Sequence, residues 1–420
     1  MVSPSPTARQ PALGFIFVTV VMAVLGFGLL IPVLPGLVTQ FRAGDVASGS
    51  HAYGALIGVF ALMQFVGSPI LGSLSDRFGR RKVILIALAG SSIDYVVMAL
   101  APNLAWLFVA RMISGLTGGV LATANAYVAD VTPPEKRAQG FGLIGAAFGL
   151  GFVIGPFLGG WLGHYDLRLP FWAAAGCASL NWLYGFFVLP ESLAPENRRP
   201  FSWKRANPVG SLVALKRFPA VLGLAEAYFI LAVAQQMLFS VWVLYTGHRY
   251  HWGPREVGLS LTAVGVLSAI VQAGLAKRII GRIGDVRGVI AGLMLSAIAQ
   301  ALYGFATQGW MIYAILVVGS LAGVAGPAMQ TYITKHVPAN EQGAVQGVFS
   351  GLMSLAGIPA PFVATWSFGW AVAHTDVLNV PGLAFFEAAA LMCFALFLAI
   401  RSFRKDHARE SMPTAHPGSA

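Results

Sequence analysis

A short polar loop between two long apolar stretches carries the residues most suggestive of chemistry. It reads Gly72-Ser-Leu-Ser-Asp76-Arg77-Phe-Gly79-Arg80-Arg81-Lys82. Asp76 is an acid able to face the positive N-terminus of a helix, and Arg80 is placed to pair with Asp130, at the end of a later apolar stretch. Gly72 permits close helix approach, and Gly79 permits a tight turn. The pattern predicts a conformational switch, and a basic loop that only fixes orientation is the plainer alternative.

Four ionisable residues lie inside apolar stretches, and these are candidates for proton coupling: Asp94, Arg111, Glu226 and Glu387. A charge at the centre of a bilayer costs at least about 3 kcal/mol, so it faces a polar cavity or a partner. Desolvation favours the protonated form of a carboxyl group, which suits a proton carrier. Arg111 reaching back to the interface, and plain solvation of the two glutamates near the ends of their stretches, are the alternatives.

A third pattern runs Gly145-Ala-Ala-Phe-Gly149-Leu-Gly151-Phe-Val-Ile-Gly155-Pro156-Phe-Leu-Gly159-Gly160. Small residues every three or four positions let helices touch backbone to backbone, and Pro156 removes a hydrogen bond and permits a bend. A general packing face is the alternative to a specific motif.

The elements that position these residues are membrane spans. Of the 420 residues, 57% are hydrophobic and only 10% charged, against about 25% charged in soluble domains. A span needs about 20 apolar residues, and twelve stretches qualify: 13–38, 53–74, 82–101, 104–129, 139–163, 170–189, 219–245, 255–276, 287–306, 309–333, 342–368 and 381–402. The sequence therefore predicts an all-α membrane protein, with lipid and not water around most of its surface.

The net charge of +11 follows from topology and not from nucleic-acid binding. Of the 27 lysines and arginines, 22 fall on one side of the predicted spans, four fall on the other, at Arg42, Arg168, Arg249 and Arg255, and Arg111 lies within a span. This is the positive-inside bias, so both termini are expected in the cytoplasm. Cys177 and Cys393 lie in separate spans and suggest neither a disulfide nor a metal site.

Two matched halves are predicted from self-similarity. A shift of 205 residues places Gly118 on Gly323, Tyr127 on Tyr332, Pro133 on Pro338, Gly142 on Gly347, Pro156 on Pro361 and Phe157 on Phe362. The expected domains are a cytoplasmic N-terminus (1–12), a six-helix half (13–189), a cytoplasmic central loop (190–218), a second six-helix half (219–402) and a disordered cytoplasmic tail (403–420). Parallel repeats of this kind place a substrate site between the halves.

These motifs resemble a known family. The loop at 72–82 is similar to the G-x-x-x-D-R-x-G-R-R/K signature of the major facilitator superfamily, and the Gly-Pro stretch resembles the antiporter motif of its drug exporters. Further stretches, at 28–35, 61–64, 93–95, 148–151, 241–244 and 343–347, look like the tetracycline exporters of that superfamily, more closely in the first half than in the second.

The resemblance implies roles for particular residues. Asp76 would meet the eleventh span and latch the outward-open state from inside, Arg111 would take part in proton coupling, and Asp94 matches a family acid and ranks first among the coupling candidates. Spans 1, 4, 7 and 10 line the cavity in the family. Neutral polar side chains in the spans are the candidates for meeting substrate, with interhelical hydrogen bonding as the alternative: Gln64, Asn125, Gln235, Gln236, Gln272 and Gln330.

The departures from the family pattern concern the charged groups that serve a metal–tetracycline complex and the proton. An acid in span 1, a histidine in span 8 and an acid in span 9 are replaced here by Ala23, Ser268 and Ser296. Export of an amphipathic drug in exchange for protons is the function expected. A facilitator or importer of a small metabolite, with the same fold, is the alternative, and a membrane sensor would need a signalling domain.

No enzyme is expected, because the chain has no Walker A loop, no H-E-x-x-H and no G-x-S-x-G. The partners expected are a small-molecule substrate, protons and the lipid bilayer, with no nucleic acid, no cofactor and no metal, and the chain is expected to act as a monomer.

Overall fold

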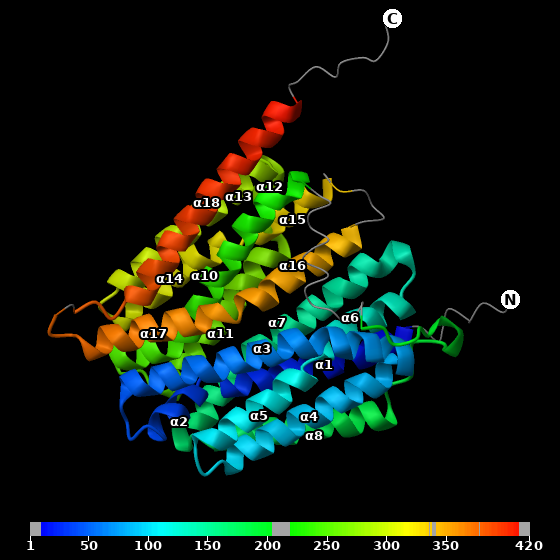
Figure 1. Cartoon of the computed structure of the whole chain (residues 1–420), viewed down its shortest axis with the longest axis horizontal. Coiled ribbons are helices and arrows are strands. Elements are labelled where there is room, and N and C mark those ends of the chain that lie inside the picture. The colour runs from blue at the N-terminus through cyan, green and yellow to red at the C-terminus, as the bar shows by residue number, and fades with distance from the viewer. Residues whose placement is uncertain (1–9, 204–218, 336, 338–341, 378, 411–420) are drawn as a thin grey trace, which may run out of the picture.

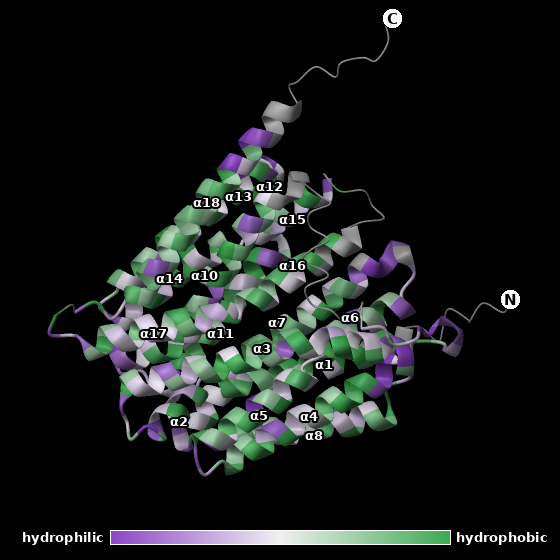
Figure 2. Ribbon diagram, viewed as in Figure 1, coloured by the Kyte–Doolittle hydropathy of each residue, from purple (hydrophilic) through white to green (hydrophobic). Residues whose placement is uncertain are grey.

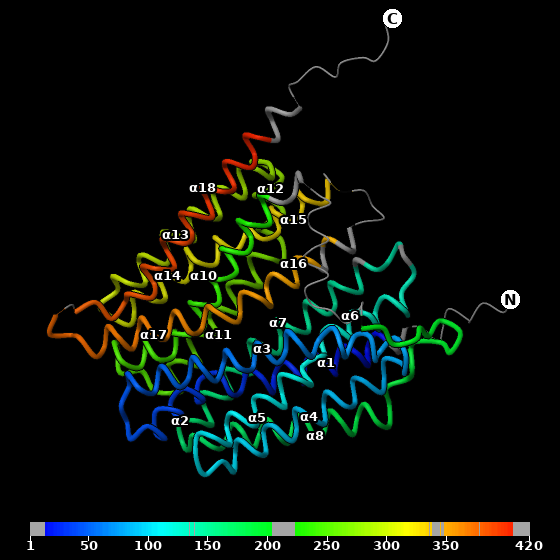
Figure 3. Tube along the Cα trace, viewed as in Figure 1, coloured from blue at the N-terminus to red at the C-terminus, as the bar shows by residue number. Residues whose placement is uncertain are grey.

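The computed structural model describes residues 10–203, 219–335, 337, 342–377 and 379–410. Figure 1 shows long helices in two groups, which diverge toward the end of the molecule where the N-terminus lies, and the tube in Figure 3 shows the same course of the chain. Parts of the predicted N-terminus, central loop and tail, including Lys204, Arg205, Lys216 and Arg217, lie outside the described residues.

The first group, here called the N-terminal bundle, consists of α1 (Gln10–Leu30), α2 (Leu34–Gln40), α3 (Val46–Phe78), α4 (Arg80–Leu100), α5 (Leu104–Thr117), α6 (Val120–Val131), α7 (Arg137–Tyr165) and α8 (Leu169–Phe187). The C-terminal bundle consists of α10 (Pro219–Tyr250), α11 (Pro254–Ile270), a π-helical turn (Val271–Leu275), α12 (Ala276–Ile283), α13 (Asp285–Phe305), α14 (Gly309–Ala322), α15 (Ala325–Lys335), α16 (Gln342–Ala356), α17 (Pro359–Ala373) and α18 (Leu383–Glu410). Short 3₁₀ turns occur at Pro134–Lys136 and Pro195–Asn197.

Eleven helices in the described part of the chain are long and apolar enough to cross a membrane. Figure 2 shows apolar residues along most of the length of these helices. Many large apolar side chains are exposed, and that of Phe187 is 76% exposed. A surface this apolar would aggregate in water, so these helices are the spans of a multi-pass membrane protein. The segment predicted as a span at 170–189 forms helix α8, which packs against α1 and α4 and is not one of these eleven. It contains Pro170 and Asn181 as well as two tryptophans and a tyrosine.

Helix boundaries recur at the interval of 205 residues found in the sequence. Gly79 and Gly284 both have positive φ, +101° and +83°, and each separates two helices. Helices α4 and α13, which follow them, are both 21 residues long. The break between α5 and α6 falls at Gly118 and that between α14 and α15 at Gly323. The same local arrangement of helices therefore occurs twice in the chain.

One boundary differs from the sequence prediction. The last helix continues to Glu410, so the first residues of the predicted disordered tail, from 403 onward, are helical. Arginine, lysine, alanine and glutamate are good helix formers, and cations near the C-terminus of a helix favour its dipole. The polar continuation of α18 beyond the apolar region follows from this composition.

The bundles touch at the end of the molecule away from the basic loops that connect α3 to α4 and α6 to α7; we call these two ends the opposite end and the basic end. On one side α7 crosses α11, where a Cβ at Gly160 would lie 2.9 Å from Cα of Gly258. On the other side α3 crosses α17, where Oγ of Ser50 donates a hydrogen bond to the carbonyl of Thr365 at 3.1 Å. The two crossings hold the bundles together near the opposite end.

We predict that Gly258→Val separates the bundles at this contact. The added methyl groups would meet the carbonyl of Pro156, 2.5 Å from an ideal Cβ, and overpacking of this kind costs about 1–3 kcal/mol. In a variant without Cys177 and Cys393, a cysteine placed at Ser50, which is buried, should react with a maleimide about tenfold faster when Gly258→Val is added.

Gly149→Val is the matched control, because a Cβ at Gly149, on the same helix α7, would meet nothing within 4 Å. Equal labelling rates in the two valine variants would contradict this account of the contact.

Candidate functional site

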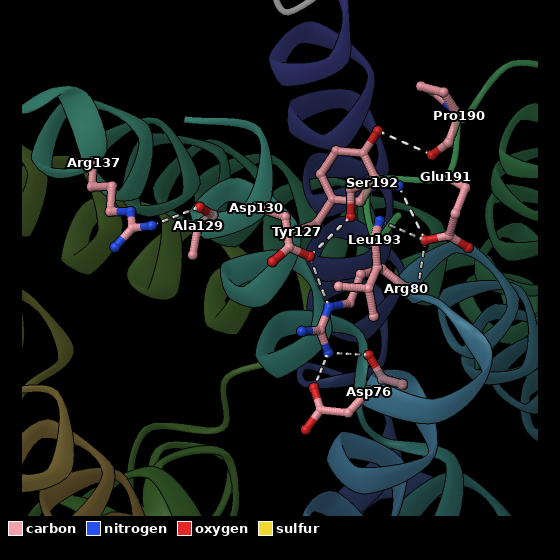
Figure 4. Close-up of polar contacts among 11 residues, drawn as sticks. Asp76, Arg80, Tyr127, Ala129, Asp130, Arg137, Pro190, Glu191, Ser192 and Leu193 are labelled. Carbon is pink, nitrogen blue, oxygen red and sulfur yellow. Dashed lines mark hydrogen bonds and ion pairs between the residues drawn. The ribbon is translucent and has the colours of Figure 1, made fainter. Parts of the chain in front are cut away.

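Arg80 is the centre of a charged cluster at the basic end of the N-terminal bundle (Figure 4). Its Nε donates to Oδ2 of Asp130 at 2.9 Å, and its Nη1 donates to Oδ1 of Asp76 at 2.6 Å and to Oγ of Ser75 at 2.8 Å. The Arg80 side chain is only 11% exposed, whereas the side chains of its partners Asp76 and Asp130 are 35% and 21% exposed. Bonds of this charge-assisted kind are shorter and stronger than neutral ones. The pairing of Arg80 with Asp130 is the one that the sequence predicts.

Glu191 completes the cluster, and sequence reasoning missed it. Its Oε1 accepts hydrogen bonds from the backbone N–H of Arg80, at 2.8 Å, and from those of Ser192 and Leu193. A carboxylate at the N-terminus of α4 satisfies a free amide and favours the helix dipole. The only signal in the sequence was an acidic residue shortly after the last apolar residues of α8. The structure places this residue close to the turn at Gly79.

The segment after α8 covers the basic end of α3. The N–H of Arg199 donates to the carbonyl of Asp76 at 3.0 Å, and the N–H of Ser202 lies 3.4 Å from Oγ of Ser73. In addition, the Tyr127 hydroxyl donates to the carbonyl of Pro190 at 3.1 Å. The described part of the central loop is therefore tied to the switch cluster of the N-terminal bundle.

The two glycines of the motif differ in what they do. Gly79 has φ of +101°, and a Cβ there would lie 2.6 Å from Cδ of Glu191, so both the backbone and the neighbour require glycine. The close helix approach expected at Gly72 is not made in this conformation by any described residue, because a Cβ there meets none of them within 4 Å. The bundles diverge at this end, so no helix of the C-terminal bundle lies against that face of α3.

The remaining motif residues lie around the cluster. Arg77 is exposed, with its guanidinium carbon 4.9 Å from the centre of the Phe78 ring, and Arg81 donates to the carbonyl of Phe186 on α8. Within the described residues, the Asp76 carboxylate is bonded only to Arg80. Side chains at the start of α16, in the predicted eleventh span, are not among those described, so the latch between Asp76 and that span stays a prediction.

The C-terminal bundle carries a related ion pair with the signs reversed. Nζ of Lys335, at the end of α15, contacts Oδ2 of Asp285, at the start of α13. These residues follow Asp130 and Arg80 by 205 positions each. The acid and the base have exchanged helices between the two bundles, while the turn glycines at 79 and 284 are retained.

A second charged site lies in the interior of the N-terminal bundle. Arg111 on α5 forms an ion pair with Asp94 on α4, and the exposed fractions of the two residues are 2% and 0%. The guanidinium also contacts Sδ of Met98 at 3.0 Å and lies over the Phe60 ring at 5.2 Å. Arg111 does not reach back to the interface, which decides between the two interpretations of this residue in favour of a partner carboxylate.

The other interior acids have different surroundings. Glu226 on α10 is exposed, which fits the simpler interpretation of solvation. Glu387 on α18 is half-buried and accepts a hydrogen bond from Oγ of Ser367 at 2.8 Å. Neither glutamate has a cationic partner within the described residues, so they are separated from the Asp94–Arg111 pair in both position and environment.

The glycines of the third motif face two different helices, α1 and α11. Gly151, Gly155 and Gly159 face α1, where Cβ atoms added to them would meet Val24, Gly28 and Leu29 within 3 Å. Gly160 faces α11 of the C-terminal bundle, as described above, and Pro156 lies inside α7 without ending it. Gly145 and Gly149 have open space. The motif therefore joins α7 to α1 and, through its last glycine, to the other bundle.

The neutral polar candidates do not form one group. Gln64 bonds weakly to the carbonyl of Gly118, with 3.5 Å between the atoms, while Asn125, Gln272 and Gln330 are exposed and Gln236 is half-buried beside Gly357. Gln235 lines a cavity inside the C-terminal bundle together with Ser268 and Ser296. Two of the positions that depart from the family pattern therefore meet in one cavity, whereas Ala23, on α1, lies in the other bundle.

We predict that the buried pair is costly to break and inexpensive to replace as a unit. Arg111→Leu leaves the Asp94 carboxylate without a partner and should destabilise the protein by about 3–5 kcal/mol, whereas Asp94→Leu with Arg111→Leu should recover most of that loss. Thermal unfolding of the purified protein in detergent, followed by circular dichroism, measures both. A double variant less stable than Arg111→Leu alone would contradict the assignment of this pair.

Comparison with known proteins agrees with this architecture. Residues 16–361 match the model of the Major Facilitator Superfamily. The chain is 40% identical over 385 residues to the class C tetracycline resistance protein of Escherichia coli, covering 92% of this chain and 95% of that one, and 38% identical over 355 residues to the class G protein of Vibrio anguillarum, covering 82% and 87%. The crystal structure of the human organic anion transporter MFSD10 (TETRAN) superposes with a TM-score of 0.70 at 26% identity, covering 94% of this chain and all of that one. With eleven apolar helices and this match over most of its length, the chain belongs to the major facilitator superfamily.

Proposed function

We propose that this protein exports an amphipathic, drug-like molecule, a tetracycline or another antibiotic, across the bacterial inner membrane in exchange for protons. The observation that carries the proposal is the 40% identity, over nearly the full length of both chains, to a tetracycline resistance protein. The interior ion pair between Asp94 and Arg111 supports it, because a membrane protein that only spanned the bilayer would have no need of these two charges.

The proposed topology has twelve spans in two halves of six, with α8 as the sixth span. The recurrence of helix boundaries at an interval of 205 residues supports two related halves, at 13–189 and 219–402, joined by the central loop at 190–218. The excess of lysine and arginine at the basic end supports a cytoplasmic position for that end and for both termini. The protein acts as a monomer in this proposal, with the lipid bilayer as its solvent.

Alternating access would proceed by rocking of one bundle against the other. The present conformation, with contacts near the opposite end and divergence at the basic end, corresponds to the state open to the cytoplasm. Closing the basic end would bring the switch cluster around Asp76 and Arg80 toward the C-terminal bundle. The contacts of Gly160 and of Ser50 at the opposite end would then break, opening the path to the outside.

Proton coupling would use the Asp94 carboxylate. A proton that binds to it neutralises the acid and breaks its ion pair with the Arg111 guanidinium, and release of that proton restores the pair. The charge state of Asp94 is therefore coupled to the packing of α4 against α5. Asn125, Gln235, Gln236 and Gln330 are the proposed contacts for substrate, on spans 4, 7 and 10.

A facilitator or importer of a small metabolite remains the second candidate, and one observation favours it. Ala23, Ser268 and Ser296 replace the charged groups that serve the metal–drug complex and the proton in the tetracycline exporters. Vesicles with an imposed pH gradient separate the two functions, because only an antiporter moves protons when substrate is added.

Drug export is tested in a bacterial host that lacks its own efflux pumps. Expression of the chain should raise the inhibitory concentration of tetracycline, or of another drug in a broad panel, several-fold over the same host carrying an Arg111→Leu variant. Susceptibility that does not change for any drug in the panel would refute the proposal.

We predict that Asp94→Asn abolishes the pH-driven part of transport. The amide cannot gain and lose a proton, but it retains the size of the acid and a hydrogen-bond acceptor for Arg111. Uptake into inverted vesicles, measured with and without a pH gradient, should be the same for this variant, whereas the gradient should accelerate the wild type at least tenfold. A normal gradient response would move the coupling role to Glu226 or Glu387, or remove it.

We predict that Asp76→Asn slows turnover at least tenfold and leaves substrate affinity within about twofold. The change removes one carboxylate from Arg80 and weakens the switch, while the substrate cavity keeps its residues. Equilibrium binding to the purified protein and transport into vesicles measure the two quantities. Transport at the wild-type rate would refute a switching role for Asp76.

A further inference from the structure

The C-terminal bundle contains a partly open cavity of about 160 Å³ between α10, α11, α13 and α14. Its polar lining consists of Gln235, Ser268, Ser296, Gln300 and Ser320, and its apolar lining includes Phe239, Trp242 and Tyr303. No lining residue is charged. An apolar cavity with a few convergent polar groups is the usual form of a small-molecule site.

The cavity occupies the place that the buried ion pair fills in the other bundle. Counting back 205 residues, the lining residues Ala299, Tyr303 and Leu316 correspond to Asp94, Met98 and Arg111. In the N-terminal bundle those three side chains contact one another and fill the space between α4 and α5. In the C-terminal bundle alanine and leucine replace the charged pair, and the equivalent space between α13 and α14 is empty of protein.

The polar groups around this space lack partners of their own. Gln300 is 3% exposed, its carboxamide makes no hydrogen bond to any described residue, and its Oε1 is fully buried. A buried amide without a partner costs about 1–3 kcal/mol. Because Oε1 is out of reach of a water-sized group in this conformation, a ligand in the cavity would accept a hydrogen bond from Nε2 of Gln300.

Three serines that line the cavity also lack hydrogen-bond partners for their hydroxyls in the described part of the chain. Hydroxyls elsewhere in these helices donate to the carbonyl four residues earlier, as those of Ser240, Thr246 and Thr262 do. The hydroxyls of Ser268, Ser296 and Ser320 make no side-chain hydrogen bond within the described residues. Serine in an apolar helix normally returns to its own backbone, so three serines that face one cavity without doing so leave donors and acceptors directed at its contents.

The walls favour a flat ring. Trp242 and Tyr303 meet edge to face, with ring centres 5.2 Å apart and planes at 90°. Nε1 of Trp242 already donates to Oγ of Ser260 at 3.0 Å, so the indole offers the cavity only its apolar surface. A cavity of about 150 Å³ accepts benzene, which sets the size of the group that this one can hold.

The lining offers no carboxylate to a divalent cation, and magnesium in proteins is usually held through carboxylates and phosphates, so the lining does not favour a chelated cation. Burial without a partner likewise disfavours a charged ligand group. The remaining class is an uncharged ring that bears adjacent donor and acceptor groups, such as an aromatic carboxamide.

We propose that this cavity binds one uncharged, carboxamide-bearing ring of the substrate in its metal-free form, with Gln300 and Ser296 as its hydrogen-bonding partners. As a substrate subsite the cavity rests on the proposed export function, whereas its affinity for a neutral ring can be measured without transport.

Benzamide is the probe, and sodium benzoate, which has the same shape and a charge, is its counterpart. Binding to the purified full-length protein is measured as a shift in melting temperature over a concentration series. Benzamide should stabilise the wild type, and benzoate should not. Gln300→Leu removes both hydrogen-bonding groups and should raise the dissociation constant about tenfold. Ala299→Leu, which fills the cavity with an apolar side chain, should abolish the shift.

Gln139→Leu, the same chemical change at an exposed position of α7, is the control and should bind benzamide as the wild type does. Equal stabilisation of wild type, Gln300→Leu and Ala299→Leu, or equal stabilisation by benzamide and benzoate, would overturn the proposal. If Gln300→Leu does not fold, Ser296→Ala and Ala299→Leu decide the matter.

Tetracycline export separates the two proposals. Wild-type efflux that is as fast with EDTA as with magnesium, and slower in Ala299→Leu, supports the cavity as a subsite for the metal-free drug. Efflux that requires magnesium, or that is unaffected by Ala299→Leu, overturns the subsite and leaves export standing. Stabilisation by benzamide without efflux of any drug in the panel refutes export and retains a site for a neutral ring.

Discussion

The cost of placing charge in lipid is the constraint on which the arrangement of this molecule depends. Arg111 and Asp94 satisfy one another in the interior of the N-terminal bundle, and neither reaches water. Among the described residues, other ion pairs lie near the ends of the helices, where Arg80 joins two carboxylates and Asp285 meets Lys335. A buried pair of this kind adds little to stability relative to apolar side chains. Its place at the centre of a bundle is the feature on which the proposed proton coupling rests.

The two bundles have different side chains at corresponding positions between their helices. Where the first bundle has an ion pair between its fourth and fifth helices, the second has neutral side chains and an unfilled space at the corresponding positions. Two separate bundles permit this division, because each needs only to keep its own helices in register. One bundle can hold the ionisable group while the other is free to hold a ligand. The reversed signs of the Asp285–Lys335 pair show that even the shared features have diverged in detail.

Much of the fold could be predicted from the sequence, because lipid imposes long apolar segments and a separation of cations that are visible in one dimension. The pairing of Arg80 with Asp130 was also predictable, since a motif and a span end fix both residues. The partnership of Asp94 with Arg111 was not, because it depends on the rotation of α4 and α5 about their axes. Glu191 was missed because its role arises from a loop that folds back onto the turn at Gly79. The cavity at Gln300 could not be predicted for a different reason. Its presence depends on several side chains that together leave space unfilled, and no single position in the sequence determines this.

The crossing of α7 and α11 at Gly160 and Gly258 brings backbone against backbone with no side chain between them. At this point the contact contains no interlocked side chains. Farther along the same two helices, Oγ1 of Thr262 on α11 donates a hydrogen bond to the carbonyl of Val153 on α7 at 3.2 Å, and the Val153 side chain faces Gly265. The shape of the glycine contact fixes the axis about which the two helices can rotate against each other, and this contact alone opposes the rotation only weakly. Resistance to opening then comes from the Thr262–Val153 hydrogen bond and from the second crossing, where Ser50 bonds to α17 and the His51 ring centre lies 5.0 Å from that of Trp366.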